Sequence, residues 1–398
     1  MKLLLIVDDY LPHSIKVAAK MMHELALEFK KNGHSVSVLT PAPLQKESLT
    51  KVEIDGIEIL NFKSGEIKNI SKAKRAINET LLSYHAWSAT KNFFGNNHFD
   101  GIVYYSPSIF WGFLVKKLRS LWKCDSYLIL RDIFPQWTLD NGLMKKNSPI
   151  YRYFKFFEWV NYKSAGTIGV MSPSNLDFFK NTKKNISKFE VLFNWSEISE
   201  IAEPKNTFRE KLDLQNKIVL FYGGNIGHAQ KMIILVDLAK RFASNTNVHF
   251  LFVGKGDEVD LILDEKEKHN LTNLTYLPSV DQNTYFEMLN EFDIGLFSLH
   301  PDHKTHNFPG KLLGYMASSK PILGCVNNGN DLMEIVNKAK AGIVVESNSE
   351  GELYQAAKFL IDSEIIRKEM GSNGRLLLSR QFSVESACIQ IEKALKKH

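Results

Sequence analysis

The chain has 398 residues, 44% of them hydrophobic and 24% charged, which is the composition of a soluble globular protein large enough for two domains. Its three widely separated cysteines exclude a disulfide framework and fit a reducing cytosol, and no apolar run approaches membrane-spanning length. The net charge of +6 is concentrated in residues 1–199, where 27 Lys and Arg against 18 Asp and Glu indicate an anionic partner: nucleic acid, a membrane surface or a phosphorylated substrate.

The first half alternates short apolar runs with amphipathic segments. Residues 3–7 are expected to form a buried strand, and this run is too short for a signal peptide. A helix over 17–31 should end at Asn32-Gly33 before a strand over 36–40. This βαβ opening lacks a Gly-x-Gly-x-x-Gly motif, so no dinucleotide cofactor is indicated. The further elements expected are a hairpin over 52–62, helices over 68–94 and 109–122, and strands over 101–105, 126–130, 165–170 and 190–193.

A second α/β series follows a polar linker over 196–205. Its expected strands cover 217–222, 248–253, 273–277 and 293–299, and its helices cover 231–243, 285–292 and a final segment over 383–397. The fold class is therefore α/β, with two Rossmann-like domains that face each other across a cleft. We expect a ligand where the strand ends of the two domains meet.

Three turns of the second half are candidates for binding a phosphate. They follow apolar strands and are Gly223-Gly224-Asn225-Ile226-Gly227, Gly254-Lys255-Gly256 and Phe308-Pro309-Gly310-Lys311. Each one alone is compatible with an ordinary turn, but three along one sheet indicate a nucleotide diphosphate. Pro309 suits a first helical turn, and Lys311 adds a cation there. Lys231, expected just inside the next helix, is either a further cation of the site or a solvated lysine.

Three carboxylates of the first half, Asp8, Asp9 and Asp132, stand at predicted strand ends. Arg131 precedes Asp132, and a neighbouring guanidinium is expected to lower the pKa of this carboxyl group. Such a group orients the substrate or accepts a proton from it; the alternative is a structural ion pair that fixes a loop.

Three histidines spaced by three, at positions 300, 303 and 306, raise the question of a zinc site. Pro301 and Lys304 disfavour a regular helix there, and no Glu or Cys completes a known pattern, so no metal is expected. His306 is instead expected to contact a sugar.

Aromatic and basic residues are interleaved over 110–123 and 145–159. This pattern suits a bilayer interface, although core aromatics with lysines on the wet face of each helix give the same pattern. Single-stranded nucleic acid would need aromatics on exposed strands, so no nucleic-acid partner is expected.

Several stretches of the chain together match the motifs of a known family. These stretches are Asp8-Asp-Tyr-Leu-Pro12, Asn32-Gly-His34, Tyr105-Ser-Pro-Ser108, Leu130-Arg-Asp-Ile-Phe-Pro-Gln-Trp137, Asn194-Trp195, Gly224-Asn-Ile-Gly-His-Ala-Gln230, Phe308-Pro-Gly-Lys-Leu-Leu-Gly-Tyr-Met-Ala317 and Lys320-Pro321. Through them the chain resembles the bacterial glycosyltransferases of family four, and most closely the N-acetyl-L-fucosaminyltransferases of O-antigen and capsule synthesis.

The resemblance implies a GT-B fold, with an acceptor-binding and membrane-facing domain over 1–198 and a nucleotide-sugar domain over 199–380. The helix over 381–398 would return to the first domain. It also implies a retaining, metal-independent transfer without a cofactor, in which a UDP-sugar is the donor substrate and a polyprenyl-pyrophosphate-linked saccharide is the acceptor. The protein would lie on the anionic inner face of the bacterial cytoplasmic membrane.

The site residues that follow from the motifs and the resemblance fall into three groups. Catalytic roles are expected for Asp132, Arg131, Lys311 and His306. The nucleotide sugar would contact Gly224, Asn225, Gly227, Gln230, Lys231, Gly254, Val280, Asn307, Phe308, Pro309, Gly310, Lys311 and Tyr315. The acceptor would contact Asp9, His13, Tyr105 and Ser106.

The chain also departs from the family pattern. Many relatives carry two glutamates eight positions apart where this chain has His306 and Gly314, so the usual ribose-binding carboxylate is missing. A non-catalytic nucleotide-sugar binding protein therefore stays open as an alternative. A GT-B UDP-sugar epimerase is a second alternative, because such an enzyme shares the two-domain cleft.

Overall fold

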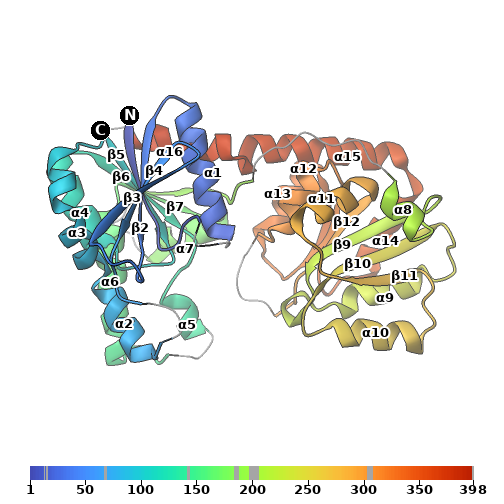
Figure 1. Cartoon of the computed structure of the whole chain (residues 1–398). Helices are drawn as coiled ribbons and strands as arrows, with labels where there is room; N and C mark the ends of the chain where they lie inside the picture. Colours follow the sequence, from blue (N-terminus) through green and yellow to red (C-terminus); the bar gives the residue numbers. More distant parts are fainter. Residues whose placement is uncertain are drawn as a thin grey trace. The chain divides into compact units, whose positions relative to one another are not determined.

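The computed structural model describes residues 1–12, 14, 17–66, 70–140, 144–182, 188–196, 206–302 and 308–396. The chain divides into two compact units (Figure 1). The amino-terminal domain comprises residues 1–193 and 384–398, and the carboxyl-terminal domain comprises residues 194–383. Both are α/β domains built on a mainly parallel sheet, so the predicted fold class is confirmed.

The amino-terminal sheet has the strand order β3-β4-β2-β1-β5-β6-β7-β8. All neighbours are parallel except β3 and β4, which form the predicted hairpin around Asp55 and Gly56, both with positive φ. The strands are β1 Lys2–Ile6, β2 Ser35–Pro41, β3 Leu49–Ile54, β4 Ile57–Phe62, β5 Gly101–Ser106, β6 Asp125–Leu130, β7 Thr167–Val170 and β8 Phe189–Val191.

Helices cover both faces of this sheet, because successive residues of a strand point to opposite faces. Leu4 and Ile6 of β1 pack in one hydrophobic cluster with side chains of α3, α4, α6 and α7. On the other face, α16 packs against α1 and β6. The helices of this domain are α1 Val17–Lys31, α2 Lys72–Thr80, α3 Leu82–Asn96, α4 Gly112–Trp122, α5 Gln136–Asp140, α6 Pro149–Ser164, α7 Pro173–Thr182 and α16 Val384–Leu395.

The single helix predicted over 68–94 is wrong, because the structure has α2 and α3 there, with Leu81 between them. The Thr80 hydroxyl donates a hydrogen bond to the carbonyl oxygen of Ala76, a contact that competes with regular helix bonding and bends helices. Lys68 itself lies outside the described residues.

The carboxyl-terminal sheet has the order β11-β10-β9-β12-β13-β14, and every pair of neighbours is parallel. Its strands are β9 Ile218–Asn225, β10 Val248–Lys255, β11 Leu274–Pro278, β12 Ile294–Ser298, β13 Ile322–Val326 and β14 Gly342–Glu346. Its helices are α8 Thr207–Lys211, the 3₁₀ turn η1 His228–Gln230, α9 Ile233–Arg241, α10 Val259–Lys268, α11 Gln282–Glu291, α12 Lys311–Ala317, α13 Asp331–Lys338, α14 Glu350–Asp362, α15 Glu364–Leu377 and the π turn η2 Leu378–Phe382.

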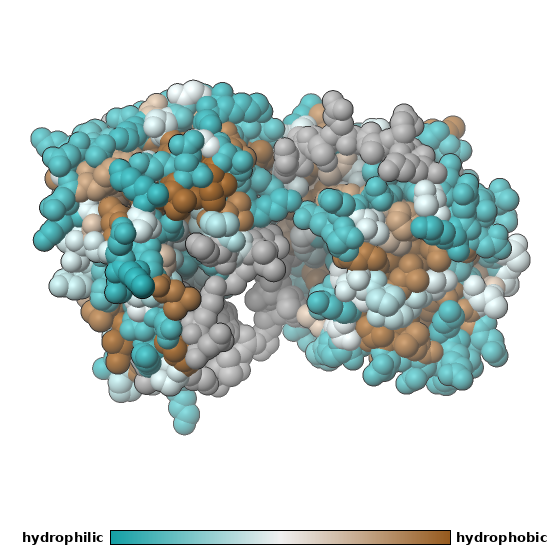
Figure 2. Space-filling view, viewed as in Figure 1, coloured by the Kyte–Doolittle hydropathy of each residue, from teal (hydrophilic) through white to brown (hydrophobic). Residues whose placement is uncertain are grey.

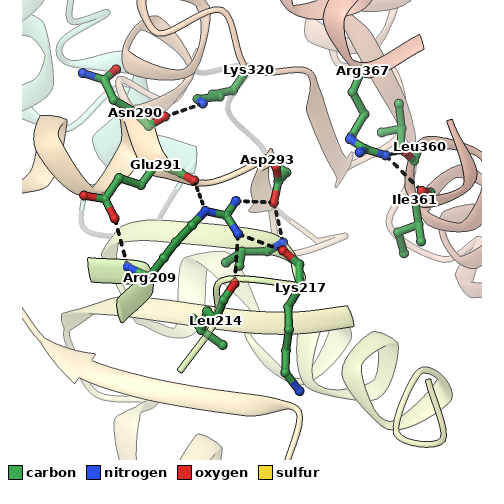
Figure 3. A network of polar contacts seen from close by, with 11 residues as sticks. Arg209, Leu214, Lys217, Asn290, Glu291, Asp293, Lys320, Leu360, Ile361 and Arg367 are labelled. Carbon is green, nitrogen blue, oxygen red and sulfur yellow. Dashed lines mark hydrogen bonds and ion pairs between the residues drawn. The ribbon is translucent and has the colours of Figure 1, made fainter. Parts of the chain in front are cut away.

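Arg209 of α8 fixes the amino ends of β9 and β12 (Figure 3). Its guanidinium donates to the carbonyl oxygens of Glu291, Leu214 and Lys217 and forms an ion pair with Asp293 at 2.7 Å. Every one of these acceptors belongs to the framework at the amino edge of the sheet. The opposite, carboxyl edge is therefore left for loops that can bind a ligand.

In the view of Figure 2, hydrophilic residues cover most of the visible surface of each domain, and hydrophobic residues form patches among them. No helix among the described residues is long and apolar enough to cross a membrane.

Candidate functional site

The first candidate turn follows β9 at the carboxyl edge of its sheet. Gly224 has φ +127° and is exposed, a backbone conformation that residues with a side chain rarely adopt. A Cβ atom on Gly224 would lie 3.7 Å from Nζ of Lys311, so the turn after β9 and the start of α12 meet here. The first and third candidate turns are therefore brought together, as predicted.

Lys311 is the most unusual group of this edge. Its Nζ atom is buried and has no hydrogen-bond partner in the described part of the chain. The ammonium lies 3.5 Å from the centre of the Tyr222 ring, and burial lowers its pKa well below the ordinary value of 10.5. A buried cation without an acceptor is costly, and an anionic ligand would remove that cost.

The loop after Gly224 is held closed by its own side chains. The amide of Asn225 donates to Oε1 of Gln230 at 2.8 Å. A Cβ on Gly227 would lie 2.5 Å from Oδ1 of Asp257, so the turn passes close to a side chain that follows the second candidate turn. The turn presents Gly224 and Asn225 outward, both exposed.

The structure corrects the placement of Lys231. This residue does not lie inside a helix: it follows the 3₁₀ turn η1 with φ 49°, and α9 begins only at Ile233. Burial raises the pKa of the Cys325 thiol, near the end of β13, to about 11. The positive charge of Lys231 opposes this rise, so Lys231 lies close enough to Cys325 to act on it. Lys231 therefore stays near the carboxyl edge of the sheet.

The predicted contact of Tyr315 is wrong because its side chain is committed inside the domain. Tyr315 is fully buried, and its hydroxyl donates to the carbonyl oxygen of Leu296 at 2.8 Å. Gly254 lies against the neighbouring strand, since a Cβ there would lie 1.9 Å from the carbonyl oxygen of Gly224. The contact of Gly254 with the nucleotide sugar stays a prediction.

The remaining predicted nucleotide contacts lie in loops. Phe308 packs against Phe382 with ring centres 4.5 Å apart. Pro309 and Gly310 precede α12, which begins at Lys311; the prediction that Pro309 lies in the first helical turn is therefore wrong. Val280 follows β11 and is exposed. His306 and Asn307 lie outside the described residues.

In the amino-terminal domain the predicted effect of Arg131 on Asp132 is wrong. The Arg131 guanidinium donates to the carbonyl oxygens of Leu192 and Phe193 and thereby fixes the segment after β8. The pKa of Asp132 is raised, not lowered, because desolvation disfavours its charged form.

A cavity of about 710 Å³ opens at the carboxyl ends of β1, β5 and β6, and Asp9, Tyr105 and Asp132 line it. Ser106, another predicted acceptor contact, is fully buried and does not line the cavity, so this assignment is wrong. His13 lies outside the described residues.

Asp8 is the cavity residue that the sequence left without a role. The indole Nε1 of Trp111 donates to its Oδ1 at 2.8 Å, and burial raises its pKa to about 7. A carboxyl group that titrates near neutral pH in a cavity is suited to binding or exchanging a hydroxyl proton. The signal in the sequence was only its position after an apolar strand, which Asp9 shares.

Among the described residues, no group of three or more His, Cys, Asp and Glu side chains is arranged to hold a metal ion. Of the three histidines at positions 300, 303 and 306, only His300 is described, and its ring packs against that of His228 in a tilted contact with centres 4.8 Å apart.

Comparison with known proteins places residues 204–377 in the family model described as "Glycosyl transferases group 1". Two curated relatives are the probable glycosyltransferase WbjE of Pseudomonas aeruginosa, 24% identical over 264 residues, and a Campylobacter jejuni enzyme, 23% identical over 239 residues. The latter is named N-acetylgalactosamine-N,N'-diacetylbacillosaminyl-diphospho-undecaprenol 4-alpha-N-acetylgalactosaminyltransferase. The matches cover 64% of this chain and 64% of WbjE, and 60% of this chain and 62% of the Campylobacter enzyme.

Solved structures match over the whole chain. Anabaena HepE in complex with UDP has a TM-score of 0.69 at 15% identity, with all of both chains covered. WaaG, a glycosyltransferase of lipopolysaccharide biosynthesis, has a TM-score of 0.62 at 14% identity, again with all of both chains covered. The chain therefore has the GT-B fold, as predicted.

Proposed function

We propose that this chain, whose residues 204–377 match the group 1 glycosyl transferases, moves a sugar from a UDP-sugar to a saccharide carried on a lipid diphosphate. The observation that carries this proposal is the buried ammonium of Lys311, which meets no acceptor among the described residues and lies beside Gly224. A diphosphate at this place supplies the missing acceptors, and the glycine lets it approach the backbone.

In the proposed reaction the bond between the anomeric carbon and the diphosphate oxygen breaks. The acceptor oxygen bonds to the same face of the sugar, and its proton passes to the departing diphosphate, so that configuration is retained. Negative charge grows on the diphosphate during this step, and the fixed ammonium of Lys311 stabilises it in surroundings from which water is excluded. We therefore propose that the reaction needs no metal ion and no cofactor.

The comparisons support the choice of substrates. HepE was solved with UDP, and the Campylobacter relative is named for the transfer of N-acetylgalactosamine to a diphospho-undecaprenol carrier. The sequence resembles N-acetyl-L-fucosaminyltransferases. UDP-linked N-acetylated amino sugars are therefore the donors to test first.

The acceptor lipid requires the protein to work at a membrane, and one face of the amino-terminal domain suits this. A groove of about 590 Å³ lies between α4 and α6, which pack against each other. Three aromatic side chains that line it, Phe113, Phe156 and Trp159, are about half exposed. Exposed aromatics of this kind insert at the level of lipid headgroups.

The same groove is basic. Lys116, Lys123 and Lys163 line it, and its described lining contains no carboxylate. The ammonium of Lys163 lies 4.9 Å from the centre of the Trp159 ring. We propose that this face, termed the α4–α6 face, binds the anionic inner surface of the bacterial cytoplasmic membrane.

The test is turnover of a panel of UDP-sugars, including UDP-N-acetylglucosamine, UDP-N-acetylgalactosamine and UDP-N-acetyl-L-fucosamine. Each is incubated with a short-chain prenyl diphosphate that carries N-acetylglucosamine, with and without EDTA. The proposal predicts transfer of a sugar to the lipid that EDTA does not stop. A new free sugar released together with UDP would instead identify an epimerase, and UDP binding without turnover a non-catalytic binding protein.

A further inference from the structure

The side chains that line the cavity of the amino-terminal domain restrict which kind of acceptor sugar can bind there. It lies at the carboxyl ends of three parallel strands, where Asp8 follows β1, Tyr105 ends β5 and Asp132 follows β6. Its volume of about 710 Å³ lies within the range of small-molecule sites and leaves room for a saccharide.

One wall of this cavity is aromatic. Phe110, Phe134 and Phe154 line it, and the ring centres of Phe134 and Phe154 are 4.8 Å apart in an edge-on contact. Phe110 joins this pair with its ring centre 6.5 Å from that of Phe154. Rings in this arrangement pack well against the C–H faces of a pyranose and position it without charge.

The polar groups of the cavity are acidic, although the domain as a whole is basic. Asp8 and Asp132 form no ion pair with a described residue, and the recorded side-chain partner of Asp8 is the neutral indole of Trp111. The described lining has one cation, Arg75, and Glu79 holds it in an ion pair at 2.8 Å. The two unpaired carboxylates thus give the described wall a negative charge.

The pKa values of both carboxyl groups are raised, and that of Asp8 reports the neighbouring negative charges. Burial raises the pKa of Asp8, and the neighbouring charges of Glu79 and Asp9 raise it further. The pKa of Asp132 is also raised, by desolvation. A negatively charged ligand would therefore meet carboxylates that are already costly to ionise.

We propose that this cavity selects a terminal acceptor sugar without negative charge, with sugar hydroxyl or amino groups on Asp8 and Asp132 and a C–H face on the three phenylalanines. Uronic acids and phosphorylated sugars are excluded. The lipid diphosphate has to contact another surface of the protein. That this sugar is the acceptor of a transfer rests on the proposed function, whereas the charge selectivity is a property of the cavity alone.

The test compares two probes that differ only in one group: methyl N-acetyl-β-D-glucosaminide and its uronic acid, in which a carboxylate replaces the C6 hydroxymethyl group. Binding is measured at pH 8 by saturation-transfer NMR on the full-length wild type. The Asp8→Asn/Asp132→Asn double variant removes the two carboxylates to which the proposal gives the sugar contact, and leaves Asp9 and Glu79 of the lining in place. The Glu47→Gln/Glu53→Gln variant makes the same change of net charge at exposed positions outside the cavity lining.

We expect the wild type and the surface variant to bind the neutral probe at least tenfold more tightly than the uronate, and the double variant to lose most of this difference. Equal binding of both probes by the wild type, or binding of neither, would overturn the proposal, as would an unchanged preference in the double variant. Asp132→Asn alone replaces the double variant if the latter does not fold. The affinity for UDP is measured on the same samples. A protein that binds UDP but shows no preference between the two probes overturns the charge selectivity alone, whereas a protein that does not bind UDP contradicts the proposed function.

Discussion

The ammonium of Lys311 lies 3.5 Å from the centre of the Tyr222 ring and meets no hydrogen-bond acceptor in the described part of the chain. The cation–π contact with this ring only partly replaces the hydration that the ammonium loses on burial, because burial still lowers the pKa of Lys311. The carboxyl edge of the second sheet is thus prepared for an anion at the expense of stability. Five predictions follow from this relationship and from the amino-terminal domain.

The first concerns the stability of the unliganded protein. Lys311→Met removes a buried charge and keeps a long apolar side chain, so we expect an increase in stability of about 1 kcal/mol, or roughly 3 °C in the melting temperature of the domain. Calorimetry without ligand measures it. Lys338→Met, at an exposed position of the same domain, should leave the melting temperature unchanged. A loss of stability in Lys311→Met would mean that the ammonium already has a partner in the folded chain.

The second concerns protons taken up on binding UDP. In the free protein the pKa of Lys311 is lowered, and a bound diphosphate raises it toward the ordinary value of 10.5. Binding is therefore strongest below the free pKa and weakens as pH rises between the two values. Titration calorimetry in buffers of different ionisation enthalpy should show net proton uptake within this window. Lys311→Met should abolish the uptake; uptake of the same size in this variant would assign it to another group.

The third concerns Asp8. Its pKa is raised from 3.8 to about 7 by burial, so the folded protein retains a proton that the unfolded chain has lost. The stability that Asp8 contributes is complete below pH 4 and is lost as pH rises through 7, by as much as about 4 kcal/mol. Asp8→Asn, which can still accept from Trp111, should therefore be more stable than the wild type at pH 8 and similar to it at pH 4. Melting temperatures whose difference stays constant with pH would contradict this assignment.

The fourth concerns the α4–α6 face. We expect the wild type to sediment with phosphatidylglycerol vesicles at low ionic strength and to be released by salt, because the basic groups act over about one Debye length. Phe113→Ser/Trp159→Ser should reduce this binding strongly. Phe359→Ser, which removes a similarly exposed aromatic in the carboxyl-terminal domain, is the matched control. Equal binding of all three proteins would exclude this face as the docking surface.

The sequence predicted the amino-terminal sheet and four of the six strands of the carboxyl-terminal sheet, mostly from continuous apolar runs, the pattern that two-sided burial imposes on parallel sheets. The strands β13 and β14 were not predicted. It also predicted the meeting of Gly224 with Lys311, since turns at the carboxyl ends of parallel strands share one edge. The burial of Tyr315 could not be predicted from the sequence. The first turns of a helix expose some side chains to a ligand and direct others toward the sheet, and the sequence does not show to which group Tyr315 belongs. The partners of Arg131 lie about sixty positions further along the chain, at Leu192 and Phe193, where local patterns give no information.

The choice between Asp8 and Asp9 illustrates the same limit. Adjacent residues of an extended segment point in different directions, and the sequence gives no sign of which one faces Trp111. Asp8 accepts from that indole, and this contact connects the first loop to the start of α4, more than a hundred residues away.

The central claim is that Lys311 binds the diphosphate of a UDP-sugar, and titration of UDP into the wild type and Lys311→Ala tests it most directly. Loss of a charge-assisted contact should weaken binding at least tenfold, while Lys338→Ala should bind like the wild type. Equal affinity of the wild type and Lys311→Ala for UDP would contradict the account.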